Sequence, residues 1–205
     1  FLENIKSGYG VMFTADRQGV GAINSLMMIG LYSFKLQASE SFRIDFGAQA
    51  TYQQMKVDVG KLVFGDAIDP NNGTIDPAYH DPQFYDSKSV GFVDFSAGLM
   101  AGYEDKFYVG MAVHHLAEPD NGFTDPSESK LSRKFTVHGG ADFNLSTMRF
   151  GDAEEDDITL SPNFLYQQQG EFHQLNAGLY GNIYPFVAGL WFRHNFENPD
   201  AIIVL

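Results

Sequence analysis

Two adjacent histidines, His114 and His115, are the residues whose type and spacing most directly suggest chemistry. Imidazole is a common metal ligand, but neighbouring residues of a strand point to opposite faces, so these rings cannot share one ion unless the strand bulges. The chain contains no Cys, which excludes thiolate metal sites, thiol catalysis and disulfide bonds. We therefore expect no metal site, with one ring at an interface and the other bonded to a neighbouring loop.

The acidic residues lack the arrangements that catalysis or calcium binding would need. Glu118, Asp120 and Asp125 follow the histidines, but no partner carboxylate stands at a defined spacing, as a glycosidase pair requires. Segment 66–76 matches a calcium loop poorly, because Gly73 is misplaced and no Glu closes the loop. The sequence also lacks a nucleophile elbow and a phosphate-binding glycine loop. It predicts neither an enzyme nor a cofactor.

Composition bounds the class of protein. The chain has 13 Lys+Arg against 26 Asp+Glu, a formal net charge of −13 that repels phosphates, so we expect no nucleic-acid partner. Its 44% apolar content excludes a disordered acidic chain, and 205 residues suggest one domain spanning residues 1–205. The longest apolar run, residues 26–32, is too short for a membrane-spanning helix. The first six residues do not resemble a signal peptide, so we expect a mature or trimmed chain.

Apolar and polar residues alternate with a period of two, which predicts strands. In segment 42–53, Phe42, Phe46 and Tyr52 share one face, whereas Gln49 and Thr51 share the other. We expect about ten antiparallel strands and no helix. Pro162 lacks the N–H that a ladder needs, so its strand should start later or carry a bulge. The clearest strands are 42–53, 93–103, 133–146 and 171–184; weaker ones are 8–14, 24–37, 107–116, 158–168, 186–195 and a stub at 201–205.

Strand length separates two all-β architectures. Strands that cross a bilayer take about 9 to 11 residues, whereas strands in globular proteins average about 5 to 6, and the clearest segments here have the greater length. Aromatic residues lie near strand ends, as they do in the interfacial girdles of membrane barrels. Connections 38–41, 104–106 and 184–185 are short, whereas 57–91 and 117–132 are long; the acidic segment 147–157 is an exception. These features predict an antiparallel, up-and-down transmembrane β-barrel.

One stretch carries a family resemblance. Residues 107–123, Phe-Tyr-Val-Gly-Met-Ala-Val-His-His-Leu-Ala-Glu-Pro-Asp-Asn-Gly-Phe, resemble the PorP/SprF family, with supporting matches at 8–10, 16–21, 46–52 and 160–165. The resemblance implies a non-enzymatic barrel in the outer membrane of Bacteroidota, within the type IX secretion and gliding-motility machinery. It further implies contact with outer-membrane lipid, with periplasmic secretion or motility components, and with secreted adhesins or other type IX substrates. Relative to the family pattern, the chain lacks the usual beginning and stops inside its last strand, so we expect more sequence after Leu205.

We expect the partner to dock at the long-loop end, because ordered loops of this length are usually functional. The proposed contacts combine aromatic and acidic residues, which would supply apolar anchors and speed encounter with a basic surface. The candidate residues are Tyr79, Phe84, Tyr85, His114, His115, Leu116, Glu118, Pro119 and Phe123.

Two other functions stay open at this point. A passive porin or hydrophobic-solute channel would use the same barrel but needs an open lumen. A soluble β-sandwich binding module would turn the apolar faces inward. The content of the lumen separates the first alternative from an anchoring barrel, because five large side chains fall on the expected inner face and would help to plug it. These are Phe92, Met100, Phe172, Tyr180 and Trp191.

Overall fold

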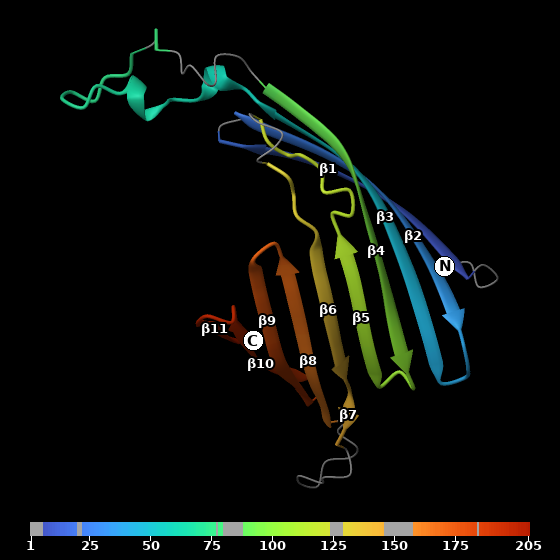
Figure 1. Ribbon diagram of the computed structural model, residues 1–205. Helices are drawn as coiled ribbons and strands as arrows, with labels where there is room; N and C mark the ends of the chain where they lie inside the picture. Colours follow the sequence, from blue (N-terminus) through green and yellow to red (C-terminus); the bar gives the residue numbers. More distant parts are fainter. Residues whose placement is uncertain are drawn as a thin grey trace.

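The computed structural model describes residues 6–19, 22–76, 78–79, 88–123, 129–145, 158–183 and 185–205, and this part of the chain is almost entirely β (Figure 1). No helix in these residues is long and apolar enough to cross a membrane. The strands are β1 (Ser7–Gln18), β2 (Ile23–Gln37), β3 (Phe42–Val57), β4 (Lys88–Tyr103), β5 (Phe107–His114), β6 (Lys134–Ala141), β7 (Phe143–Asn144), β8 (Ile158–Gln169), β9 (Phe172–Ile183), β10 (Phe186–His194) and β11 (Pro199–Val204). They form one antiparallel sheet in the order β1-β2-β3-β4-β5-β6-β8-β9-β10-β11, and the short β7 pairs with β8 beside β6.

The predicted all-β, up-and-down fold is confirmed, and several strands are longer than expected. β3 pairs with β2 without a register shift from Arg43 opposite Gln37 to Val57 opposite Ile23. It pairs equally regularly with β4 along the whole of both strands. The alternation in the sequence weakens toward Val57, but the ladder continues because pairing on both sides satisfies the backbone groups there.

The sheet is a single curved layer. Figure 1 shows it curling into an open trough, with β1 and β11 at its two edges. Every described strand belongs to this one sheet, so no second sheet faces it, and the soluble sandwich alternative is wrong for this architecture. The sheet is not closed, but its order and curvature are compatible with the wall of a barrel.

On the sheet, several polar side chains are buried and many large apolar side chains are exposed, the reverse of the pattern in a soluble protein. Among the described residues the buried polar ones, Thr51, Asp94, Ser96 and Asn176, share one face of the sheet, which we call the inner face. The opposite, outer face carries large apolar residues that stay exposed, including Phe46, Val93, Phe95, Met111, Phe135, Leu190 and Phe192.

The strand that contains Pro162 corrects one expectation. β8 neither starts later nor bulges, because it begins at Ile158 and keeps one register with β9, with Pro162 opposite Leu179. The strand on the other side of β8 is interrupted instead: it is divided at Asp142 into β6 and β7, which both pair with β8. A proline can donate no hydrogen bond to that side, so the expected strand 133–146 is split there instead.

The contrast between the two ends of the sheet is also smaller than expected. At the end that carries the long connections β3–β4 and β5–β6, β1 and β2 are joined by a short turn, and so are β8 and β9. Gly19 and Gly170 adopt φ values of +57° in these turns, a conformation that glycine adopts without strain. We call this end the loop end and the opposite one the turn end.

Candidate docking surface at the loop end

The connection between β3 and β4 is ordered through its own hydrogen bonds over residues 58–76. It contains two short 3-10 helices, η1 (Val59–Lys61) and η2 (Gly65–Ala67), and a bridge between Ile68 and Ile75. Within the bridge, the backbone N of Asp69 donates to Thr74 O at 2.9 Å and Gly73 N donates to Asp69 O at 2.8 Å. Figure 1 shows this connection projecting beyond the ends of the strands.

Of the three residues predicted here, only one falls in the described part. The Tyr79 hydroxyl donates to Asp66 Oδ2 at 3.4 Å, so this ring is held by its own loop. Phe84 and Tyr85 lie outside the described residues. The partner-binding role of all three stays a prediction.

The structure adds three residues to this surface that sequence reasoning missed. Val63, Ile68 and Ile75 are 57%, 42% and 54% exposed, respectively. They present branched apolar side chains from a connection that is otherwise rich in Asp, Asn and Gly. Apolar residues in a polar loop were the available signal, but only the bridge between Ile68 and Ile75 shows that these two residues lie side by side.

The connection between β5 and β6 turns back along the sheet. β5 is short and covers only Ala97–Tyr103 of β4, which leaves the loop-end half of β4 without a strand on that side. The connection enters this space, where Leu116 N donates to Phe95 O at 3.0 Å. Its two described arms then bond each other, with Leu131 N donating to Pro119 O at 2.9 Å and a bridge between Asp120 and Lys130.

His115 anchors this connection to the inner face. Its Nδ1 lies 2.7 Å from Asp94 Oδ2, and the Asp94 residue is 4% exposed. The expected strand 107–116 ends at His114, and His115 has a φ of +58°. The rule that neighbouring strand residues point to opposite faces therefore does not apply to His114 and His115. The expectation that a ring here bonds a neighbouring loop is therefore corrected, because the partner of His115 is a strand residue. Asp94 was missed as that partner, since nothing in the sequence relates positions 94 and 115.

The other predicted residues of this connection are placed differently from one another. Pro119 is buried, and the Glu118 carboxylate lies 3.3 Å from Arg133 Nη2. Phe123 is partly buried, whereas Leu116 is 39% exposed. Leu116 is thus the apolar side chain of this group that is most open to a partner. Among the described residues, no group of three or more His, Asp or Glu side chains is arranged to hold a metal ion.

On the inner face, two of the side chains expected to plug the lumen lie along the wall. The Trp191 indole covers Gly178, its register partner, so closely that a Cβ at Gly178 would clash with the ring. Tyr180 covers Gly189 in the same way, where a Cβ would lie 2.7 Å from the tyrosine ring. The two rings meet edge to face with centroids 5.7 Å apart. Glycine therefore makes room for flat aromatic side chains on this wall.

Comparison with known proteins adds one finding to this geometry. The family model described as type IX secretion system membrane protein PorP/SprF matches residues 1–205, the whole chain. The comparison with curated proteins gives no match.

Proposed function

The chain belongs to the PorP/SprF family of type IX secretion system membrane proteins, and from this premise we propose that it forms the wall of an outer-membrane β-barrel that anchors or guides secreted surface proteins. The observation that carries the membrane part of this proposal is the exposed apolar outer face. Phe46 is 43% exposed and Phe95 49%, on strands whose inner faces carry buried polar residues, and Leu190 on β10 is 55% exposed. Such a surface is stable when hydrocarbon covers it.

The spacing of aromatic residues on this face supports the same orientation. Phe42 and Tyr52 lie ten residues apart on the outer face of β3. At a rise of about 3.4 Å per residue and a strand tilt of about 40°, they are about 26 Å apart along the membrane normal. This matches the apolar band of outer-membrane barrels, about 25 Å tall with an aromatic girdle at each boundary.

In this orientation the loop end faces the cell surface and provides the docking site. Val63, Ile68 and Ile75 supply apolar contacts on a connection that its own hydrogen bonds keep ordered. Leu116 supplies a further apolar contact beside the His115–Asp94 anchor. The partner is a secreted adhesin or another type IX substrate, and the turn end faces the periplasmic components. The function is binding and guidance, without catalysis.

The test removes the apolar contacts while the connection stays in place. In the native host, the triple variant Val63→Ser, Ile68→Ser, Ile75→Ser should insert normally, as shown by heat-modifiable migration, but should retain at most a tenth of the secreted surface protein that co-purifies with the natural protein. Asn71→Ser in the same connection is the matched control and should retain all of it. Full co-purification with the triple variant would remove this loop from the docking site.

A passive channel is the second candidate, and one observation favours it. Tyr180 and Trp191 rest on glycines of the wall, so these two rings do not project across the inner face. Steady conductance of the purified protein in a planar bilayer, unchanged by the triple loop variant, would support the channel. A sealed bilayer would support the anchoring role.

A further inference from the structure

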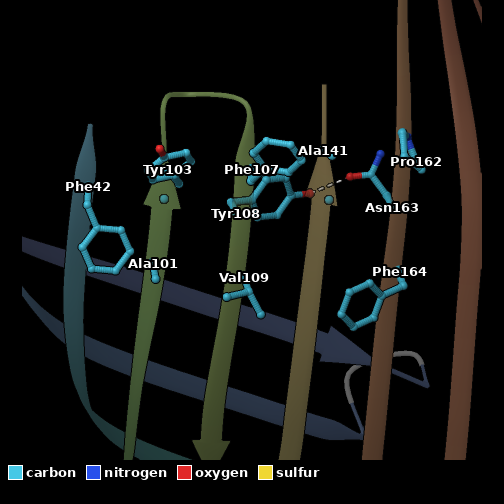
Figure 2. A pocket seen from close by; sticks show the side chains of 12 residues that line it. Phe42, Ala101, Tyr103, Phe107, Tyr108, Val109, Ala141, Pro162, Asn163 and Phe164 are labelled. Atoms are coloured by element: carbon cyan, nitrogen blue, oxygen red, sulfur yellow. Dashed lines mark hydrogen bonds between the residues drawn. The ribbon is translucent and has the colours of Figure 1, made fainter. Parts of the chain in front are cut away.

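A groove opens on the outer face near the turn end, across strands β3, β4, β5, β6 and β8 (Figure 2). Its volume is about 530 Å³, within the range of about 300 to 1,000 Å³ that is usual for small-molecule sites. Figure 2 shows Ala101, Val109 and Ala141 between larger side chains. The larger side chains include the rings of Phe42, Tyr103, Phe107 and Phe164.

Small residues create the groove at positions where bulky ones would fill it. Ala101 stands in register between Ile44 of β3 and Val109 of β5. The next outer residue of β4 toward the loop end is Leu99, which is 39% exposed and stands opposite Phe46. The groove is therefore local, because larger side chains cover the outer face on its loop-end side.

The opposite side of the groove is shaped by a glycine. A Cβ built at Gly139 would lie 2.8 Å from the Phe164 ring, so the ring leans over the backbone of β6. Since Gly139 is also in register with Val109, the Phe164 ring leans toward the floor of the groove and bounds it on this side. Phe164 and the Phe107 ring thus stand on either side of a trough that is floored by small side chains.

The polar side chains of these strands, Tyr108 and Asn163, lie on the inner face, behind the groove. Tyr108 is in register with Gly102, an even number of positions from Ser96, and both Tyr108 and Asn163 are in register with Gly140. The Tyr108 hydroxyl donates to Asn163 Oδ1 at 2.7 Å, as Figure 2 shows. Asn163 Nδ2 in turn donates to Ser161 O at 2.9 Å. Apart from the Tyr103 hydroxyl at the turn end, the side chains that line the groove on the outer face are therefore apolar and offer an occupant no hydrogen bond, which favours a hydrocarbon chain over a peptide or a sugar.

We propose that this groove binds one acyl chain of a membrane phospholipid. The inference rests on the proposed function, because it requires the outer face to lie in the bilayer. The Tyr103 and Phe107 rings then stand at the membrane boundary, on either side of the hairpin that joins β4 to β5. The hairpin carries Lys106, whose Nζ lies 3.6 Å from Glu104 Oε2, so charges of both signs face the headgroup. A zwitterionic phospholipid such as phosphatidylethanolamine matches this pair.

The test fills the groove and counts the lipid that stays bound. The natural protein is reconstituted in phosphatidylethanolamine vesicles, extracted in mild detergent and analysed by native mass spectrometry. We expect one phospholipid to remain per protein, and Ala101→Leu to lower this occupancy at least tenfold. Ala141→Leu fills the other side of the floor and should act in the same direction. Ala50→Leu adds the same side chain to the outer face of β3 outside the groove and should leave occupancy unchanged.

Each outcome bears on a distinct claim. Equal retention by the natural protein and both groove variants would overturn the acyl-chain site, as would equal loss in Ala50→Leu. A natural protein that inserts but retains no phospholipid would show that only general boundary lipid covers this face, and would also overturn the site. Failure of the natural protein to insert into vesicles, seen as absent heat-modifiable migration, would instead refute the proposed function and with it the occupant of the groove.

Discussion

The sharpest test of the two faces uses adjacent residues of β3. Ala48 lies on the outer face and Gln49 on the inner face, near the middle of the stretch between Phe42 and Tyr52. From the spacing worked out above, Ala48 is about 3 Å from the membrane midplane. An arginine on the lipid face costs about 2 to 4 kcal/mol at that depth and about 0 to 1 kcal/mol near the boundaries. We therefore expect Ala48→Arg to lower the free energy of unfolding by about 2 to 4 kcal/mol, and Gln49→Arg by less than about 1 kcal/mol.

The measurement is equilibrium unfolding of both variants in urea from lipid vesicles, with folding followed by heat-modifiable migration. A loss of about 2 to 4 kcal/mol corresponds to a decrease in the folding equilibrium constant of about 25- to 700-fold. Phe46→Arg should resemble Ala48→Arg, since Phe46 shares the outer face near the same depth. If Gln49→Arg proves the more costly of the adjacent pair, the faces are assigned inside out and the orientation argued above is wrong.

Two further predictions concern the inner face. Gly178→Ala should destabilise the protein by about 1 to 3 kcal/mol, because the added methyl group clashes with the indole of the neighbouring strand. Gly181→Ala on the same strand, with no heavy atom within 4 Å of the new Cβ, should change the urea midpoint little. Asp94→Ala should cost about 1 to 3 kcal/mol and increase protease cleavage in connection 115–133, because it removes the anchor of that connection. Asp45→Ala breaks a half-exposed ion pair and should cost about 0 to 1 kcal/mol without increasing cleavage; equal cleavage in both aspartate variants would count against the anchor.

The alternation of residue types was enough to predict the strands and their two faces. Segment 42–53 places Phe42, Phe46 and Tyr52 opposite Gln49 and Thr51, and the structure keeps this division, with Phe46 and Tyr52 exposed and Thr51 buried. Such a prediction succeeds because side chains of a strand alternate whatever the strand pairs with. It fails where pairing decides the outcome, as at Pro162, whose effect falls on β6 and β7 instead of on its own strand.

The candidate site was less predictable, because it depends on contacts between distant residues. The His115–Asp94 bond requires β5 to end at His114 and its connection to turn back along β4, which no local pattern reveals. The exposure of Val63 and Ile75 likewise depends on how the β3–β4 connection folds on itself. Residue types directed attention to these two connections, but the contacts and the exposure of their side chains could be read only from the tertiary arrangement.

The distribution of apolar residues explains why a chain with this composition suits a membrane. Its mean hydropathy is only −0.20, and its 44% apolar content is ordinary for a soluble protein. Yet among the described residues the buried apolar side chains are Ala22, Ile29, Val57, Ala67 and Pro119, too few and too small to form the core that stabilises a globular domain. In the orientation proposed above, alternate strand residues meet lipid, so the mean hydropathy of the chain is low even though one face of the sheet is apolar. In that orientation, the hydrocarbon around the outer face supplies the stabilisation that a buried core supplies in a globular domain, so the stability of the fold depends on the bilayer as well as on the sequence.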